Sequence, residues 1–173
     1  MASYEYLISS LPMLKADGEM PFSYDEFLEM CKSSLREKRY QALESLDLST
    51  TEGPLMDKWA KFYGVLAEEL TYQRNLRLGR PCDAPADRDQ DTIKTVTAAL
   101  NAKNPLEAEV MLLSLEFDKL DSLVSMHYFD DYVLNGYALK LKLLERQTIF
   151  EKAAGRAEFS RLMDTIQQQV LSI

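Results

Sequence analysis

The stretch that decides the fold is "NPLEAEVMLLSLEFDKLDSLVSM", residues 104–126. It opens with strong helix-start signals, because Asn104 is a preferred N-cap residue, Pro105 suits the first helical position, and Glu107 suits the positive end of the helix dipole. Apolar side chains then recur around much of the helix, at Leu106, Val110, Met111, Leu113, Leu115, Phe117, Leu120 and Leu123. A helix that is apolar nearly all round lies either at the centre of a bundle or beneath a partner protein. The sequence leaves both alternatives open.

Upstream of this stretch, the apolar residues also follow a helical period. Ser23 and Glu26 have the spacing of a capping box, which predicts a helix that starts at Ser23. A short helix is expected over 37–46, and a long one from Pro54 to about Leu78, with Gly79 as its C-terminal cap. The inner stripe of the long helix comprises Leu55, Trp59, Phe62, Leu66 and Leu70, and its solvent-facing side comprises Lys58, Lys61, Glu68, Glu69 and Arg77. The stretch 91–103 predicts another helix, with Ile93, Val96 and Leu100 facing inward.

Downstream, the pattern predicts a long helix from about Tyr128 to Glu151, a break at Gly155 and a last amphipathic helix. The inner face of the long helix is expected to comprise Phe129, Val133, Tyr137, Leu141 and Leu144. The apolar side of the last helix is expected to comprise Phe159, Leu162, Met163, Ile166 and Val170.

These patterns predict an all-α protein, a bundle of six or seven helices in a single domain spanning 1–173. A folded chain of this size buries roughly 68–70% of the surface that its unfolded form exposes, so a core is available without disulfides or metal. The opening "SYEYLISSLPML" predicts either a short extended segment or a helical turn, ended by Pro12. The polar, proline-rich loop 79–91 is the one place where the sequence allows a sub-domain boundary.

Charge and composition exclude several classes of function. The formal net charge is −8, whereas nucleic-acid binding needs concentrated positive charge. The densest basic run, "LREKRYQ" at 35–41, is interpreted as a solvated helix face. The two cysteines match no metal or redox spacing, and we expect Cys31 to be buried and Cys82 to be exposed in a polar loop. No apolar run is long enough for a membrane span and no signal peptide is recognisable, so a cytoplasmic location is expected.

The only histidine is a candidate metal ligand. His127, Asp130 and Asp131 stand at i, i+3 and i+4, which lie on one face of a helix. A metal site needs three or four ligands and a supporting outer shell, and no second histidine exists. We therefore predict no metal ligands and no bound cofactor, and interpret Asp130 and Asp131 as acidic residues in the first turn of a helix. Phosphate-binding glycine loops and nucleophile motifs are also absent from the sequence.

Three segments carry a family resemblance: "NPLEAEVMLLSLEFDKL", "YFDDYVLNGYALKLKLLERQTIFE" and "AGRAEFSRLM". Together they resemble the C-terminal helical segment of the C-type subunit (or d-type subunit) of V-type ATP synthases. The opening "YLISSLPML" and "PFSYDEFLEMCK" are similar to a smaller bacterial family encoded with V-type ATPase subunits. Full-length members of the C-type family are much longer and repeat a helical bundle three times, for which this chain is too short.

The resemblance implies a non-catalytic, all-helical protein that connects the central stalk of a rotary ATPase to its membrane ring of proteolipid subunits. Such a protein would support proton or sodium transport and would lie at the inner face of the cell membrane through its partners. The expected partner-contacting residues are Tyr128, Tyr137, Lys140, Lys142 and Arg146. Two alternatives remain: a cytosolic helical adaptor outside any ATPase, and a metal-dependent hydrolase built on His127, Asp130 and Asp131.

Overall fold

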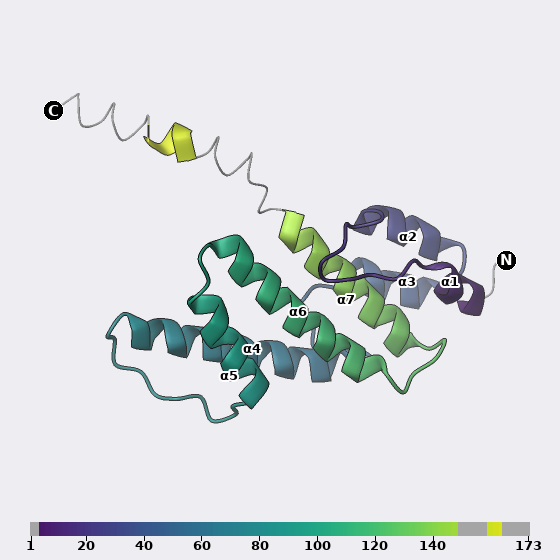
Figure 1. Cartoon of the computed structure of the whole chain (residues 1–173). Coiled ribbons are helices and arrows are strands. Elements are labelled where there is room, and N and C mark those ends of the chain that lie inside the picture. The colour runs from purple at the N-terminus through teal and green to yellow at the C-terminus, as the bar shows by residue number, and fades with distance from the viewer. Residues whose placement is uncertain (1–3, 149–158, 164–173) are drawn as a thin grey trace.

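The computed structural model describes residues 4–148 and 159–163, and these residues are all-α (Figure 1). The helices are α1 (Tyr4–Ser10), α2 (Tyr24–Lys32), α3 (Glu37–Glu44), α4 (Met56–Arg77), α5 (Gln90–Leu100), α6 (Pro105–Val124) and α7 (Asp131–Thr148). A further helical turn lies within 159–163, and no strand occurs in the described parts of the chain. The predicted all-α, multi-helix fold is confirmed.

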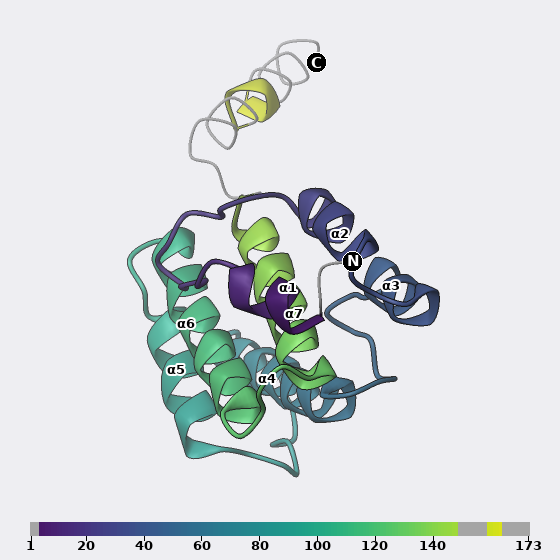
Figure 2. The same cartoon turned by 90° about the vertical axis from the view of Figure 1, so that its right-hand side faces the viewer.

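Helices α6 and α7 form an antiparallel hairpin, and the other helices pack around it. Helix α5 lies against both α6 and α4, while α2 lies against α7 and against α3. Figure 2 shows α7 in the middle, with α2 and α3 on one side of it, α5 and α6 on the other, and α4 below. All seven of these helices contribute buried side chains to one apolar cluster, which extends from Leu7 of α1 to Leu144 of α7 and includes Val96 of α5.

The most buried helix is α7, although the sequence pointed to α6 as the candidate centre. The buried residues of α7 are Leu134, Gly136, Ala138, Leu139, Leu141, Leu143 and Leu144. In α6 only Leu113, Glu116, Phe117 and Leu120 are buried, and Leu106 is exposed. The expectation that Phe129 faces inward was wrong, because it precedes α7 and its side chain is 51% exposed.

The hairpin closes tightly near its turn because of a glycine. A Cβ atom added to Gly136 would lie 2.8 Å from Cγ1 of Val124, the last residue of α6. Real Cβ atoms essentially never come this close to another heavy atom. Gly136 therefore lets α7 approach α6 more closely than a residue with a side chain would allow.

Most helix starts follow the sequence signals. Ser23 and Glu26 form the reciprocal capping box, and the side chain of Asn104 accepts a hydrogen bond from the backbone N–H of Glu107. The opening segment, for which the sequence allowed either an extended segment or a helical turn, is helix α1, whereas α7 begins at Asp131 rather than at the expected Tyr128. The predicted helix end at Glu151, the break at Gly155, and Ile166 and Val170 lie outside the described residues.

The loop between α4 and α5 folds back along α4, starting from Gly79 at a positive φ of 64°. Arg88 in this loop binds Glu69 of α4 through two hydrogen bonds of 2.8 and 2.7 Å. The thiol of Cys82 contacts the carbonyl of Tyr72 at 3.7 Å, so Cys82 is half-buried rather than exposed. The expectation that Glu69 faces solvent was wrong, because this residue is only 1% exposed. Periodicity alone could not reveal that a loop arginine covers it.

Candidate interaction site at the α6–α7 turn

Three large apolar side chains project from the turn that joins α6 to α7. Met126 is 86% exposed, Tyr128 is 79% exposed and Phe129 is 51% exposed. They lie within four consecutive residues at one end of the hairpin (Figure 1). Single exposed apolar residues are common on protein surfaces, whereas a contiguous group often marks an interaction site. We call residues 126–129 the apolar turn.

Hydrogen bonds hold this turn in shape. Nδ1 of His127 lies 2.6 Å from Oδ2 of Asp130. The other carboxylate oxygen of Asp130 accepts hydrogen bonds from the backbone N–H groups of Tyr132 and Val133, at 3.1 and 3.2 Å. Asp130 thus satisfies donors at the start of α7 that have no partner within the helix. The carboxylate joins the turn to the helix.

Ring contacts also hold the turn in shape. The imidazole of His127 is stacked on the ring of Tyr132, with centroids 3.9 Å apart and an interplanar angle of 2°. The ammonium of Lys58 lies 5.4 Å from the centroid of the same Tyr132 ring. The side-chain amide of Asn135 donates to the carbonyl of Pro54 at 2.9 Å. The start of α7 is therefore attached to the start of α4 as well as to the turn.

The backbone of Phe129 has a positive φ of 49°. A bulky residue in this left-handed region is uncommon and costs free energy. The side chain gains little from burial here, since half of it faces solvent. The hydrogen bonds of Asp130 on one side and the stacked His127 on the other hold this conformation, and as a result Phe129 points outward beside Tyr128.

The electrostatics of the turn favour a charged Asp130. Burial alone would raise the pKa of Asp130, but the hydrogen bonds from His127 and from the backbone of Val133 and Tyr132 outweigh it, so that the pKa lies below its ordinary value. The carboxylate is therefore ionised over the neutral range, in the form that accepts these hydrogen bonds.

The three candidate metal ligands do not converge. Asp130 binds His127, but Asp131 turns away to Arg39, at 3.1 Å, and accepts a hydrogen bond from the hydroxyl of Tyr4 at 2.8 Å. Within residues 4–148 and 159–163, no three His, Cys, Asp or Glu side chains gather as metal ligands would. The geometry assigns His127 and Asp130 to the frame of the turn and Asp131 to a contact between α7, α1 and α3.

The residues expected to contact a partner occupy different environments. Tyr128 belongs to the apolar turn. Tyr137 is half-buried against the rings of Phe22 and Phe27, and burial raises the pKa of its hydroxyl to about 12. Lys140 and Lys142 already have partners within the chain, namely Asp121 at 2.6 Å and the ring of Tyr24 at 4.0 Å. Partner contacts by these residues stay a prediction.

Arg146 lies in an interior cluster that joins α7 to α6. Its guanidinium donates to Glu116 through two hydrogen bonds of 3.0 and 2.6 Å and to Glu109 through one of 2.8 Å. The cluster lines a crevice of about 240 Å³ beside Tyr63 and Arg74 of α4. Burial raises the pKa of Glu116, and the hydrogen bonds and charge of Arg146 only partly oppose this effect.

Sequence reasoning missed Glu116 and the exposed Met126. Glu116 stands among the apolar positions of α6, next to Leu115 and Phe117, and an acidic residue in such a stripe signals a buried ion pair. Met126 lies beyond the last helical apolar position, where periodicity gives no guidance.

No protein-family model, curated protein or solved structure matches this chain. None of the helices among the described residues has the length and apolar character needed to cross a membrane.

Proposed function

We propose that this chain is a non-catalytic component of a rotary V-type ATPase that connects the central stalk to the membrane ring of proteolipid subunits, and that the apolar turn is one of its contact sites. The observation that carries the proposal is the rigid presentation of Met126, Tyr128 and Phe129 at one end of the α6–α7 hairpin.

The contacts that hold the apolar turn in shape support a docking role. Binding is strengthened when a surface is already in its bound shape, because less conformational freedom is lost on association. The His127–Asp130 hydrogen bond, the capping of α7 and the stacked Tyr132 supply that order before any partner arrives. Aromatic residues and methionine are also enriched at the centres of protein interfaces.

The resemblance of residues 104–163 to the C-type family supports the identity of the complex. The residues that carry it, from "NPLEAEV" through "YFDDYVLNGYALKLKLLER", form α6, the turn and α7. The apolar turn therefore lies in the segment that resembles the family, and the partner is expected to bury the turn in a complementary apolar surface. A cytosolic adaptor outside any ATPase would use the same turn for a different partner.

Co-purification tests the proposal. The full chain is co-expressed with the central-stalk and proteolipid-ring subunits of the same organism, and complexes are separated by size exclusion and identified by mass spectrometry. We expect a stoichiometric complex with the stalk or the ring subunits. A double substitution, Met126→Ser with Tyr128→Ser, is expected to weaken it by at least about tenfold, since hot-spot truncations cost ~2 kcal/mol or more.

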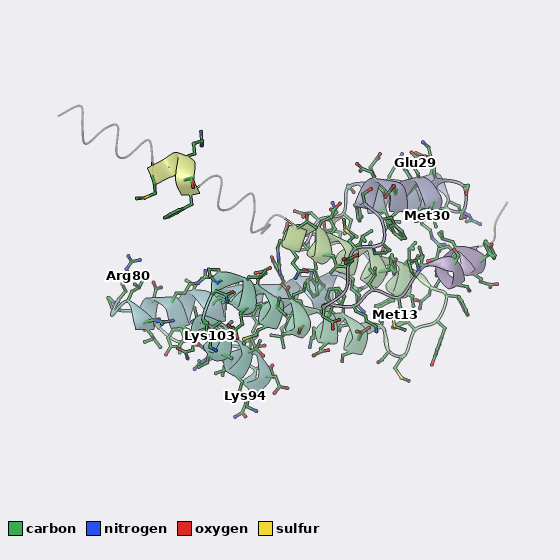
Figure 3. All side chains as sticks on the ribbon, turned by 45° about the horizontal axis from the view of Figure 1, so that its top comes forward. Met13, Glu29, Met30, Arg80, Lys94 and Lys103 are labelled. Atoms are coloured by element: carbon green, nitrogen blue, oxygen red, sulfur yellow. The ribbon has the colours of Figure 1, made fainter. Side chains whose placement is uncertain are left out.

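The matched control is Met13→Ser. Met13 is 84% exposed, nearly the same as Met126, but it lies in the connection between α1 and α2 (Figure 3). Its substitution should leave the complex intact. A chain that migrates alone with all stalk and ring subunits would contradict the proposal and leave the adaptor alternative in its place.

A further inference from the structure

The C-terminal end of α4 differs in charge from the rest of the molecule. Between Glu69 and Asp83 the sequence contains no acidic residue, although the chain as a whole carries a net charge of −8. The cations of this end are Arg74, Arg77, Arg80 and, from the connection between α5 and α6, Lys103. Figure 3 shows Arg80 projecting from the far end of α4, and Lys103 on the same half of the molecule.

Two exposed leucines lie among these cations. Leu76 is 53% exposed and Leu78 is 63% exposed. The helix end that carries them is well defined, because the backbone N–H groups of Leu78 and Arg80 donate to the carbonyls of Arg74 and Asn75. We call Arg74, Leu76, Arg77, Leu78, Arg80 and Lys103 the α4 end.

The position of this surface is fixed by the rest of the fold. The guanidinium of Arg77 donates to the carbonyl of Leu100 at the end of α5, which ties the last turn of α4 to the neighbouring helix. The basic run 35–41 is different, because its Arg39 binds the carboxylate of Asp131. The densest basic run in the sequence is thus partly neutralised. Within the described residues no carboxylate forms an ion pair with the four cations of the α4 end, although Arg74 lines the same crevice as Glu109 and Glu116.

Helix electrostatics alone do not account for these residues. Cations in the last turn of a helix are favoured by the helix dipole, which explains Arg74 and Arg77. The helix dipole does not explain Arg80 and Lys103, because both lie outside α4. It also does not explain why Leu76 and Leu78 are exposed. Arginine beside exposed apolar residues is a common composition of protein interfaces.

We infer that the α4 end is a second docking surface, for an acidic protein surface that carries apolar side chains among its carboxylates. Charge complementarity selects this partner, since the chain is acidic elsewhere and would repel an acidic protein at other faces. Four cations on a chain of net charge −8 fit a protein partner better than nucleic acid, which demands a wider basic surface. The inference holds whichever complex contains this chain and does not rest on the proposed ATPase.

The two docking surfaces lie toward opposite ends of the molecule. Helix α4 has 22 residues and is therefore about 33 Å long, and it begins near the start of α7 beside the apolar turn. Its other end carries the basic surface (Figure 1). One chain could thus contact two different proteins at once.

Binding of a defined acidic peptide tests the inference. The probe is a fluorescent peptide of repeated Glu-Glu-Leu, and its neutral counterpart has Gln in place of Glu. Fluorescence anisotropy with the full chain should show binding of the acidic peptide that weakens with added salt, and little binding of the neutral peptide. The double substitution Arg74→Gln with Arg80→Gln should weaken binding about tenfold.

The matched control is Lys61→Gln with Lys94→Gln. It removes two exposed cations of the neighbouring faces of α4 and α5, so both variants have the same net charge. We expect the control to bind the peptide nearly as the unchanged chain does. Equal losses in both variants, or no binding by the unchanged chain, would overturn the inference. Arg74- and Arg80-dependent binding to phosphatidylserine vesicles, without peptide binding, would overturn it in favour of a membrane.

Discussion

Two glutamates in this protein are equally hidden from solvent, yet their surroundings shift their pKa values in opposite directions. Glu69 of α4 and Glu116 of α6 are each 1% exposed, and each is held by an arginine. The hydrogen bonds of Arg88 lower the pKa of Glu69 below its ordinary value, while burial raises that of Glu116. Burial alone does not decide which form of a carboxyl group is stable.

Desolvation is the largest influence on the pKa of Glu116, between α6 and α7, whereas the hydrogen bonds of Arg88 outweigh it at Glu69. The sharing of each cation adds to this difference. Arg88 binds one carboxylate through two hydrogen bonds, and the side-chain amide of Gln73 adds a third to Glu69 at 2.7 Å. Arg146 divides its donors between Glu116 and Glu109, so one positive charge serves two negative ones inside the helix packing. The negative charge of Glu109 also opposes ionisation of Glu116.

The largest effect is expected from Arg146→Met. The substitution leaves Glu116 buried beside Glu109 without a cation, and breaking a buried pair typically costs about 3–5 kcal/mol of unfolding free energy. Urea denaturation at neutral pH measures the loss. The double variant Arg146→Met with Glu116→Leu should recover much of it, because the most deeply buried carboxylate is gone and only Glu109, whose side chain is 16% exposed, has lost its cation. A double variant as unstable as the single one would show that packing, rather than charge, dominates this cluster.

A smaller loss is expected from Arg88→Met. The side chain of Arg88 is 31% exposed, so water can reach the hydrogen-bond positions that it vacates. We expect the free energy of unfolding to fall, but by less than in Arg146→Met, because water replaces part of the lost hydrogen bonding. Arg80→Met serves as the control and should change stability by less than about 0.5 kcal/mol. The loop between α4 and α5 should also exchange its amide hydrogens faster. A loss of unfolding free energy equal to that of Arg146→Met would show that the two arginines stabilise the fold equally, contrary to this expectation.

The pH dependence of stability should differ in sign between the two sites. For Glu69, whose pKa is lowered in the folded state, the stabilising contribution is present above the ordinary value of 4.5 and is lost as the pH falls through the folded-state pKa. For Glu116, whose pKa is raised, the contribution is full below 4.5 and declines as the pH rises through the folded-state pKa. Each unit of pKa difference corresponds to about 1.4 kcal/mol.

Glu69→Gln and Glu116→Gln separate these contributions. Urea unfolding across the mildly acidic to neutral range should show that Glu116→Gln removes a decline in stability with rising pH, whereas Glu69→Gln removes a decline with falling pH at the acidic end. The same slope change in both variants would mean that the two carboxyls titrate alike.

The smallest effect is expected at the surface. Met126→Ser with Tyr128→Ser removes side chains that are almost fully exposed, so the free energy of unfolding should change by no more than about 0.5 kcal/mol. Thermal unfolding followed by circular dichroism measures it. A large loss would mean that these side chains support the fold, and any loss of binding in the same variant would then lack a specific cause.

The sequence predicted those parts of the fold that depend on neighbours along the chain. The capping box of Ser23, the start of α6 at Asn104 and Pro105, and the end of α4 at Gly79 all depend on residues within one or two helical turns. Local hydrogen bonding and backbone preference determine such features, and both can be read from short segments.

Features that depend on distant contacts were predicted less well. Glu69 was placed on the solvent side because its partner, Arg88, lies 19 positions away in a loop. The identity of the central helix was also unclear, since the apolar pattern of α6 is as strong as that of α7 and only packing decides which one is surrounded. His127 and Asp130 were weighed only together with Asp131 as metal ligands, and their role in shaping an exposed turn required the backbone geometry of Phe129.

The contact between Gly136 and Val124 makes the spacing of α6 and α7 sensitive to any side chain at position 136. With no side chain at position 136, α7 lies directly against the last residue of α6, close to the turn. A methyl group at position 136 would push α7 away from α6 close to the turn. The part of α7 that follows, from Gly136 to Thr148, is about 18 Å long. A small separation of α6 and α7 at Gly136 would therefore displace the C-terminal end of α7 further, where Arg146 binds Glu116 of α6. The hairpin is thus joined near both ends, by the close packing of Gly136 against Val124 and by the hydrogen bonds of Arg146 to Glu109 and Glu116.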